Sequence, residues 1–195
     1  MTIADSEPVQ KVRKALKDAG LADSVVELDA PMESAAETAK ALDTEPGAIV
    51  TSRVYAIGKR MVLVLVAGDH ECLEANLAAA FFLEGEVRVP SDAEVRGITG
   101  FTTDRVPPVG FAHKLPTAID RSLKRFQRLY AAAGDPQCVF KTSVTDLKLL
   151  TEGIVSYNIA QPLEGEAEVP PMPRNKTFTG ERKVPGVEDG AEDGA

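Results

Sequence analysis

The sequence predicts one α+β domain rather than a doubly wound parallel sheet. Its 195 residues are 44% apolar, which is enough for a single sizeable core but short for two domains. Segments typical of strands are numerous and do not alternate strictly with segments typical of helices. Two of them, residues 48–57 and 60–67, are separated only by Gly58-Lys59, which predicts a tight antiparallel hairpin.

The first part of the chain predicts an amphipathic helix. Val9, Val12 and Leu16 recur at helical spacing within residues 7–19, and Gly20 follows as a stop signal. The other elements expected before the hairpin are a strand at 25–28, a helix at 34–42 and a turn at 45–47.

Capping and turn residues indicate the element boundaries after the hairpin. Ser91 and Glu94 have the spacing of a capping box, so a helix is expected to begin there and to end near residues 97–100. Residues 102–116 contain three prolines and a glycine and therefore predict an ordered loop of the kind that often has a function. The remaining expected elements are helices at 73–83 and 144–150, a helical turn at 122–126, and strands at 86–89, 115–119, 128–132, 138–141 and 154–159.

The composition changes after residue 160. Residues 161–195 contain eight acidic and four basic residues and are rich in Pro and Gly, so we expect a disordered acidic tail after a folded domain at 1–160. Residues 113–148 instead carry seven basic and three acidic residues, although the whole chain has a net charge of −8. The basic side chains near the expected helical turn either contact tRNA or form an ordinary solvated surface. They are Arg121, Lys124, Arg125 and Arg128.

Composition also argues against several classes of protein. The longest apolar run, residues 61–67, is far shorter than the roughly 20 residues of a membrane helix, and the N-terminus does not resemble a secretory signal. Cys72 and Cys138 lack CxxC spacing, which is typical of a reducing compartment, so we expect a cytoplasmic protein. Known zinc spacings, catalytic serine elbows, phosphate loops and dinucleotide fingerprints are absent, so we expect no metal and no cofactor.

The segment from Asp104 to Asp120 carries the most specific pattern. It reads DRVPPVG and then FAHKLPTAID; a Thr-Gly pair precedes it at 99–100, and an Ala-Gly pair follows the next strand at 133–134. In this order the pieces resemble the YbaK/ProX family, which has a G-x-x-x-P loop, a glycine and an L-P-x-x-I-D strand. Pro108 stands at the loop proline and Gly110 at the glycine. The resemblance extends from about residue 34 to residue 152.

The resemblance implies a mixed, mostly antiparallel, barrel-like sheet surrounded by helices. It also implies an aminoacyl-tRNA deacylase, a hydrolase that cleaves the ester between a wrong amino acid and the tRNA 3′ end. Mischarged tRNA is then the expected partner, together with an aminoacyl-tRNA synthetase as a candidate second partner. The ester is already activated, so backbone N–H groups of the loop at residues 104–108 are expected to hold its carbonyl without a protein nucleophile. The alternative is that Pro107 and Pro108 form only a rigid turn.

Two positions depart from the family pattern. Asp104 stands where the loop normally begins with glycine. Thr51 stands in place of the functional lysine, and threonine offers one hydrogen bond but no charge. Arg53 lies two residues further on and therefore on the same face of the expected strand, so it is a candidate replacement cation unless it simply faces solvent.

The resemblance and these departures give one set of candidate site residues. The candidate catalytic residues are Thr51, Arg53, Asp104, Pro108 and Gly110, and the candidate substrate-binding residues are Tyr55, His113, Asp120 and Gly134. We expect a small or medium amino acid such as alanine or serine to be removed. Two other functions stay open: an inactive module of the same fold that binds tRNA or a synthetase, and a hydrolase of a different small aminoacyl ester.

Overall fold

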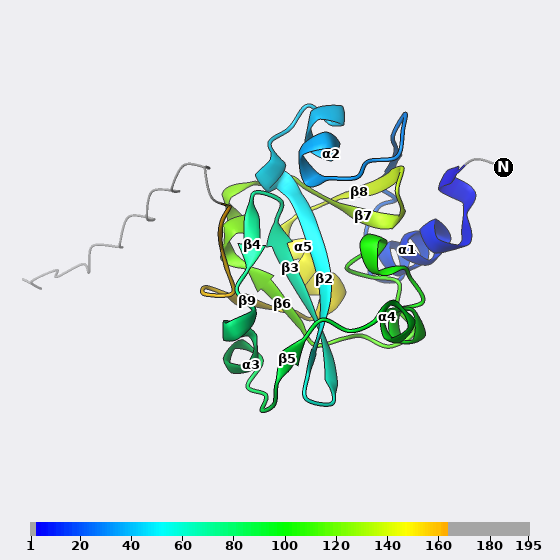
Figure 1. Cartoon of the computed structure of the whole chain (residues 1–195). Helices are drawn as coiled ribbons and strands as arrows, with labels where there is room; N and C mark the ends of the chain where they lie inside the picture. Colours follow the sequence, from blue (N-terminus) through cyan, green and yellow to red (C-terminus); the bar gives the residue numbers. More distant parts are fainter. Residues whose placement is uncertain (1–2, 164–195) are drawn as a thin grey trace, which may run out of the picture.

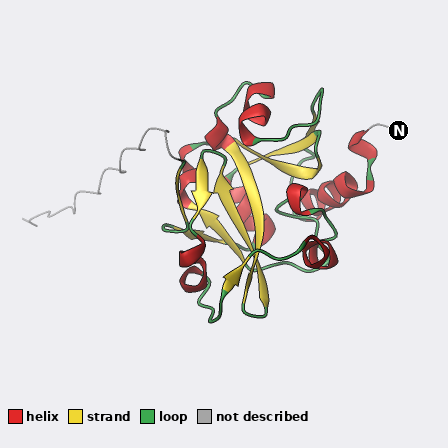
Figure 2. Cartoon of the chain, in the orientation of Figure 1, coloured by secondary structure: helices red, strands yellow, loops and turns green. Residues whose placement is uncertain are grey.

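A computed structural model describes residues 3–163 and shows helices around a strongly curved sheet (Figures 1 and 2). The expected tail, from residue 164 onward, lies outside these described residues. The helices are η1 Ile3–Asp5, α1 Glu7–Asp18, α2 Ala35–Ala41, η2 Pro46–Ala48, η3 Glu74–Asn76, α3 Leu77–Ala80, α4 Asp92–Thr99, η4 Thr103–Arg105, η5 Arg121–Arg125 and α5 Val144–Thr151. The strands are β1 Val25–Glu27, β2 Ile49–Ile57, β3 Arg60–Ala67, β4 His70–Cys72, β5 Val87–Arg88, β6 Thr117–Asp120, β7 Leu129–Asp135, β8 Cys138–Thr142, β9 Ile154–Ser156 and β10 Ala160–Pro162.

The main sheet has the order β1-β8-β7-β2-β3-β6-β9, with β5 added beside β2. The pairs β2–β7, β3–β6 and β6–β9 are parallel, and the other pairs are antiparallel. The β2–β3 hairpin turns through Gly58-Lys59, as expected, and pairs Val50 with Ala67 at its far end. The mixed α+β fold with a curled sheet is therefore confirmed.

Alternation along β2 and β3 divides the core between the two faces of the sheet. Val50 and Val54 face the larger cluster, to which α1, α4 and α5 contribute. Tyr55 and Ile57 face the second cluster, which is covered by α3 and by the segment leading into β10. A third cluster lies under α2 at one end of β2. Figure 1 shows α1 and α4 on one side of the molecule and α3 with β4 on the other.

One expectation about the elements was wrong in detail, and one element was not expected. The helix expected at 73–83 is only the 3₁₀ turn η3 followed by the four-residue α3, which ends at Ala80. Phe82, two residues further on, adopts a positive φ of 53°. The element not expected is the small β4–β10 sheet, in which Cys72 pairs with Ala160. Because β10 extends to Pro162, regular structure continues past the expected boundary at residue 160.

Candidate functional site

The middle of β2 has a free edge. On the side away from β3, β2 pairs with β7 only through Ile49 and Val50 and with β5 only through Ala56 and Ile57. Within the described chain, the intervening residues 51–55 have a strand partner on the β3 side alone. The 3₁₀ turn η4 packs against both β2 and β7. The loop at residues 102–116, called the proline loop below, therefore begins beside this free edge.

Thr51 and Arg53 lie on the same face of β2, as expected. They pair with Val66 and Val64, which belong to the second cluster, so this face is the one opposite to α1 and α5. Thr51 is half-buried and Arg53 is exposed. Among residues 3–163, Arg53 forms no ion pair, so its charge is available to an incoming anion.

The proline loop is anchored by side chains rather than by backbone hydrogen bonds. Val106 and Val109 are 3% and 5% exposed and pack into the larger cluster, and Pro107 and Pro108 are also buried. Within the described part of the chain, no backbone N–H from Val106 to Leu115 donates a hydrogen bond. Proline has no N–H, so the donors next to the two prolines are those of Val106 and Val109. Unpaired donors of this kind are normally satisfied by water or by a ligand.

Gly110 and Gly134 come together around one aromatic ring rather than around an open space. Both have a positive φ, 95° and 88°, and both lie against Phe101. A Cβ atom at Gly110 would be 3.3 Å from Phe101 Cζ, and one at Gly134 would be 2.8 Å from Phe101 Cε1. The resemblance identified the two glycines but not the ring that they enclose.

Tyr55 and Asp120 lie on the same face of the sheet as Arg53 but beneath the surface. Each is 2% exposed. Burial, together with the neighbouring thiol of Cys72, raises the pKa of Tyr55 well above its usual value. Burial likewise raises the pKa of the Cys72 thiol. Direct contact between the Tyr55 side chain and a substrate is therefore not available in this conformation.

The buried carboxylate of Asp120 is only partly satisfied. Its Oδ2 accepts a hydrogen bond from the backbone N–H of Ser122 at 2.8 Å, which starts η5. Its Oδ1 atom and the hydroxyl of Ser122 are buried and have no hydrogen-bond partner among the described residues. Asp120 therefore supports the turn after β6, while one of its buried oxygens has no hydrogen-bond partner among the described residues.

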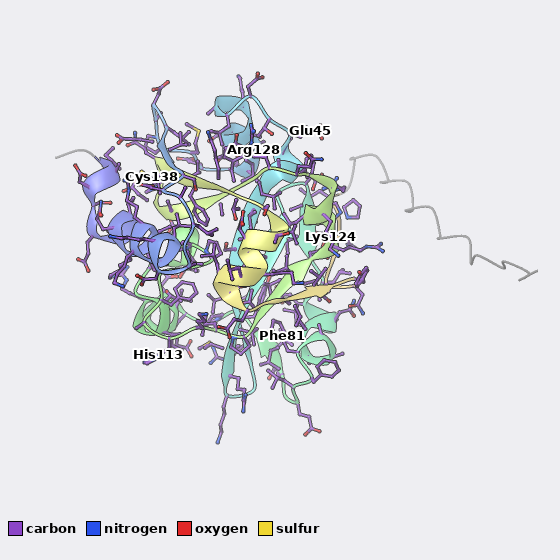
Figure 3. The ribbon with its side chains drawn as sticks, turned by 180° about the vertical axis from the view of Figure 1, so that it is seen from behind. Glu45, Phe81, His113, Lys124, Arg128 and Cys138 are labelled. Atoms are coloured by element: carbon purple, nitrogen blue, oxygen red, sulfur yellow. The ribbon has the colours of Figure 1, made fainter. Side chains whose placement is uncertain are left out.

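Asp104 and His113 are exposed at the two ends of the loop region. Asp104 lies in η4, beside the free edge of β2, whereas His113 follows the proline loop at the other end of that segment. Figure 3 shows His113 at the opposite end of the molecule from Arg128. The structure thus places Asp104 in a turn that contacts β2, but it does not gather all nine candidate residues into one cavity.

A pocket of about 580 Å³ lies between α1, the loop and the C-terminal end of α5. Pro108 and Gly110 line it, whereas Thr51 and Arg53 do not. Its three lysines are paired with carboxylates at 2.5 to 2.9 Å, so their charge is largely compensated. These pairs are Lys11–Glu7, Lys14–Asp18 and Lys114–Glu152.

The basic side chains after β6 differ in whether they have a partner. Arg125 is bound to Asp69, which also accepts a hydrogen bond from Nδ1 of His70 at 2.7 Å. Lys124 lies over the ring of Tyr157 and is exposed, as is Arg128 (Figure 3). Among the described residues there is no cluster of three His, Cys, Asp or Glu side chains that could hold a metal ion, and no helix is long and apolar enough to cross a membrane.

The curled sheet and the proline loop can be compared with those of known protein families. The chain matches the aminoacyl-tRNA editing domain over residues 29–150, and it belongs to this family, as the resemblance to YbaK/ProX proteins predicted. A solved structure described provisionally as a trans-editing enzyme for prolyl tRNA synthetase is 34% identical, with a TM-score of 0.71 over 78% of this chain and 96% of that one. A scaffold protein used for epitope backbone grafting is 31% identical, with a TM-score of 0.73 over 81% and 99% of the two chains.

Curated relatives are much longer proteins. The proline–tRNA ligase of Bacillus velezensis is 25% identical over 162 residues, which are 77% of this chain and 27% of that protein. The proline–tRNA ligase of Lysinibacillus sphaericus is 26% identical over 99 residues, which are 51% of this chain and 17% of that protein. The chain therefore spans about a quarter or less of the length of these relatives.

Proposed function

We propose that this protein is a trans-editing deacylase that hydrolyses the ester between a wrong amino acid and the 3′ end of tRNA. The observation that carries the proposal is the proline loop, which begins beside the free edge of β2 and whose N–H groups from Val106 to Leu115 have no acceptor among the described residues. Donors that are fixed before the reaction stabilise a developing oxyanion without reorganisation. The family to which the chain belongs and its similarity to parts of two proline–tRNA ligases support a role in editing.

In the proposed reaction, water adds to the ester carbonyl and the bond between the carbonyl carbon and the ribose oxygen breaks. The N–H groups of Val106 and Val109 hold the carbonyl oxygen as it becomes negative, while the ribose oxygen leaves with a proton. The vicinal ribose hydroxyl helps to position the water. Arg53 supplies the positive charge that the lysine supplies in other members of the family, and Thr51 adds one hydrogen bond.

We place the aminoacyl end at the β2 edge rather than in the pocket behind the loop. Arg53 is exposed and has no ion pair among the described residues, whereas each lysine of the pocket already has a carboxylate partner. Ala132 follows Ala131, which pairs with Val50 at the start of the free edge, and its side chain is small. The described residues do not by themselves define how large an amino acid is accepted. We expect alanine or serine to be released faster than an aromatic amino acid.

A panel of tRNAs mischarged with different amino acids tests the proposal. We expect release of the wrong amino acid above the rate of the uncatalysed reaction, with correctly charged tRNA left intact. Aminoacyl esters without tRNA serve as a second panel, and faster hydrolysis of these than of tRNA-linked esters would point to a different small-ester hydrolase.

One observation favours the alternative of a binding module without catalysis. Thr51 cannot neutralise charge, and Arg53 reaches the site from a position two residues away. Binding of tRNA or of prolyl-tRNA synthetase with no hydrolysis of any ester in either panel would establish this alternative.

A further inference from the structure

Phe101 lies where three segments of the chain meet. Gly100 ends α4 with a φ of 78°, and the backbone N–H of Phe101 then donates a hydrogen bond to Thr99 Oγ1 at 3.1 Å. The ring is 3% exposed. It packs edge to face with Phe111 at a centroid distance of 5.9 Å, and Nζ of Lys11 in α1 lies 5.9 Å from its centroid.

The two glycines beside this ring leave space for it. Real Cβ atoms do not approach another atom as closely as the 2.8 Å that a side chain at Gly134 would require against Phe101. At Gly110 the 3.3 Å approach is less severe, but a backbone carbon of Lys11 lies equally close. Absence of a side chain at both positions therefore lets Phe101 touch the end of β7 and the end of the proline loop at the same time.

The loop has few other restraints. Its N–H groups from Val106 to Leu115 donate no hydrogen bond within the described chain, and a pocket of about 580 Å³ borders Pro108 to Phe111. In this stretch Gly110 lies against the ring of Phe101 and the α1 backbone at Lys11. The packing of Val106 and Val109 fixes the middle of the loop. Contact between Gly110 and Phe101 fixes its C-terminal end.

We infer that Phe101 is a positioning residue for the proposed hydrolysis. Its ring holds the donors of Val106 and Val109 at a fixed place relative to β2 by bridging Gly110 and Gly134. This inference rests on the proposed function and assigns a role to a residue outside the loop motif. Displacement of an oriented group by about 1 Å can cost up to about a hundredfold in rate, so a loosened loop lowers kcat more than it raises KM.

Phe101→Leu tests the role of the ring, with Phe140→Leu as the matched control. Phe140 is a fully buried phenylalanine of the same cluster but lies on β8. With mischarged tRNA, at a temperature where both variants are folded, we expect kcat to fall about tenfold or more for Phe101→Leu and less than twofold for Phe140→Leu. Equal kcat values for Phe101→Leu and the unmodified protein would overturn the inference.

A double-mutant cycle tests the contact with Gly134 separately. Gly134→Ala drives a methyl group into the ring, whereas Gly20→Ala introduces the same kind of backbone strain, at a φ of 74°, with no atom within 4 Å. We expect Gly134→Ala to lower kcat about tenfold in the unmodified protein but less than threefold in the Phe101→Leu background, and Gly20→Ala to leave kcat unchanged in both. Fully additive effects of Gly134→Ala and Phe101→Leu would contradict the inference.

Backbone relaxation measured by NMR separates the inference from the proposed function. If the unmodified protein hydrolyses no ester, the function fails, but the amides of Val106, Val109 and Gly110 still report whether Phe101 orders the loop. We expect lower order parameters for these amides in Phe101→Leu than in Phe140→Leu. Unchanged order parameters in Phe101→Leu would overturn the positioning role whatever the activity.

Discussion

Nη2 of Arg125 lies 2.5 and 2.6 Å from the two carboxylate oxygens of Asp69. The pair joins η5 to the turn after β3, and Gly47 lies so close that a Cβ atom there would meet both side chains. Burial alone would raise the pKa of Asp69, but the hydrogen bonds from Arg125 and His70 outweigh it and hold that pKa below its usual value. The ionised carboxylate is therefore the form that stabilises this corner of the fold.

The Asp69–Arg125 pair predicts a pH-dependent contribution to stability. Asp69→Asn should lower the free energy of unfolding at pH 7 by about 2 kcal/mol, after allowing for the partial exposure of Arg125. Because the pKa is depressed in the folded state, this contribution is present above the unfolded value of about 3.9 and is lost as the pH falls through the folded pKa.

Urea denaturation of the two proteins between pH 7 and pH 3 measures this effect. The difference in free energy of unfolding should shrink as the pH falls below about 4. Glu152→Gln removes the exposed ion pair with Lys114 and serves as the control, for which we expect no measurable difference. A difference for Asp69→Asn that stays constant over this range would show that ionisation of Asp69 does not matter.

Substitution of Arg53 should lower the activity without lowering the stability of the fold. Because its side chain is exposed, Arg53→Ala should leave the melting temperature unchanged while lowering kcat/KM about tenfold or more. Arg60→Ala, which removes an exposed cation from the start of β3, should change neither quantity. Thr51→Lys in the Arg53→Ala background should restore part of the activity, since it returns a cation to the same face of β2. Full activity of Arg53→Ala would place the chemistry elsewhere.

Pro108→Ala should affect turnover more than stability. The proline is buried in the loop, and its replacement adds conformational freedom to the unfolded chain at a cost of only about 1 kcal/mol. Added freedom in the loop itself displaces the N–H donors, so kcat should fall about tenfold or more. Pro136→Ala, in the turn between β7 and β8, provides a comparison for the cost of proline removal alone. Equal kcat values for the two variants would remove the loop from the mechanism.

Removal of residues 164–195 should leave both folding and hydrolysis nearly unchanged. The segment has few apolar residues, and the match to the editing family ends at residue 150. The last described strand, β10, ends at Pro162, so the truncation point lies beyond it. Thermal unfolding and the deacylation assay measure the effect, and a large fall in melting temperature would contradict this prediction.

Which residues of β2 and β3 face the same side of the sheet could be predicted from the sequence, and the structure agrees. The apolar residues of β2 and β3 and the two-residue turn between them determine which residues share a face, so the common face of Thr51 and Arg53 followed directly. Burial of Tyr55 and Asp120 could not be predicted. Part of the layer over that face is the β4–β10 sheet, whose three-residue strands are far apart in sequence and too short to show a periodicity of their own.

The surroundings of the glycines also required the structure. A glycine in a motif indicates close approach or a positive φ, but the sequence does not show what approaches. Here Gly110 and Gly134 both contact Phe101, which stands just before the loop and belongs to no catalytic pattern. The role of Asp69 also required the structure, because the sequence does not show that Arg125, one of a group of basic residues, lies beside it.

The central claim is tested most directly by the rate at which the protein releases the wrong amino acid from each mischarged tRNA of the panel. The account predicts release well above the uncatalysed rate from at least one mischarged tRNA, retention of the ester in correctly charged tRNA, and a large loss of the rate in Arg53→Ala and Pro108→Ala. Release at the uncatalysed rate for every mischarged tRNA of the panel would contradict it.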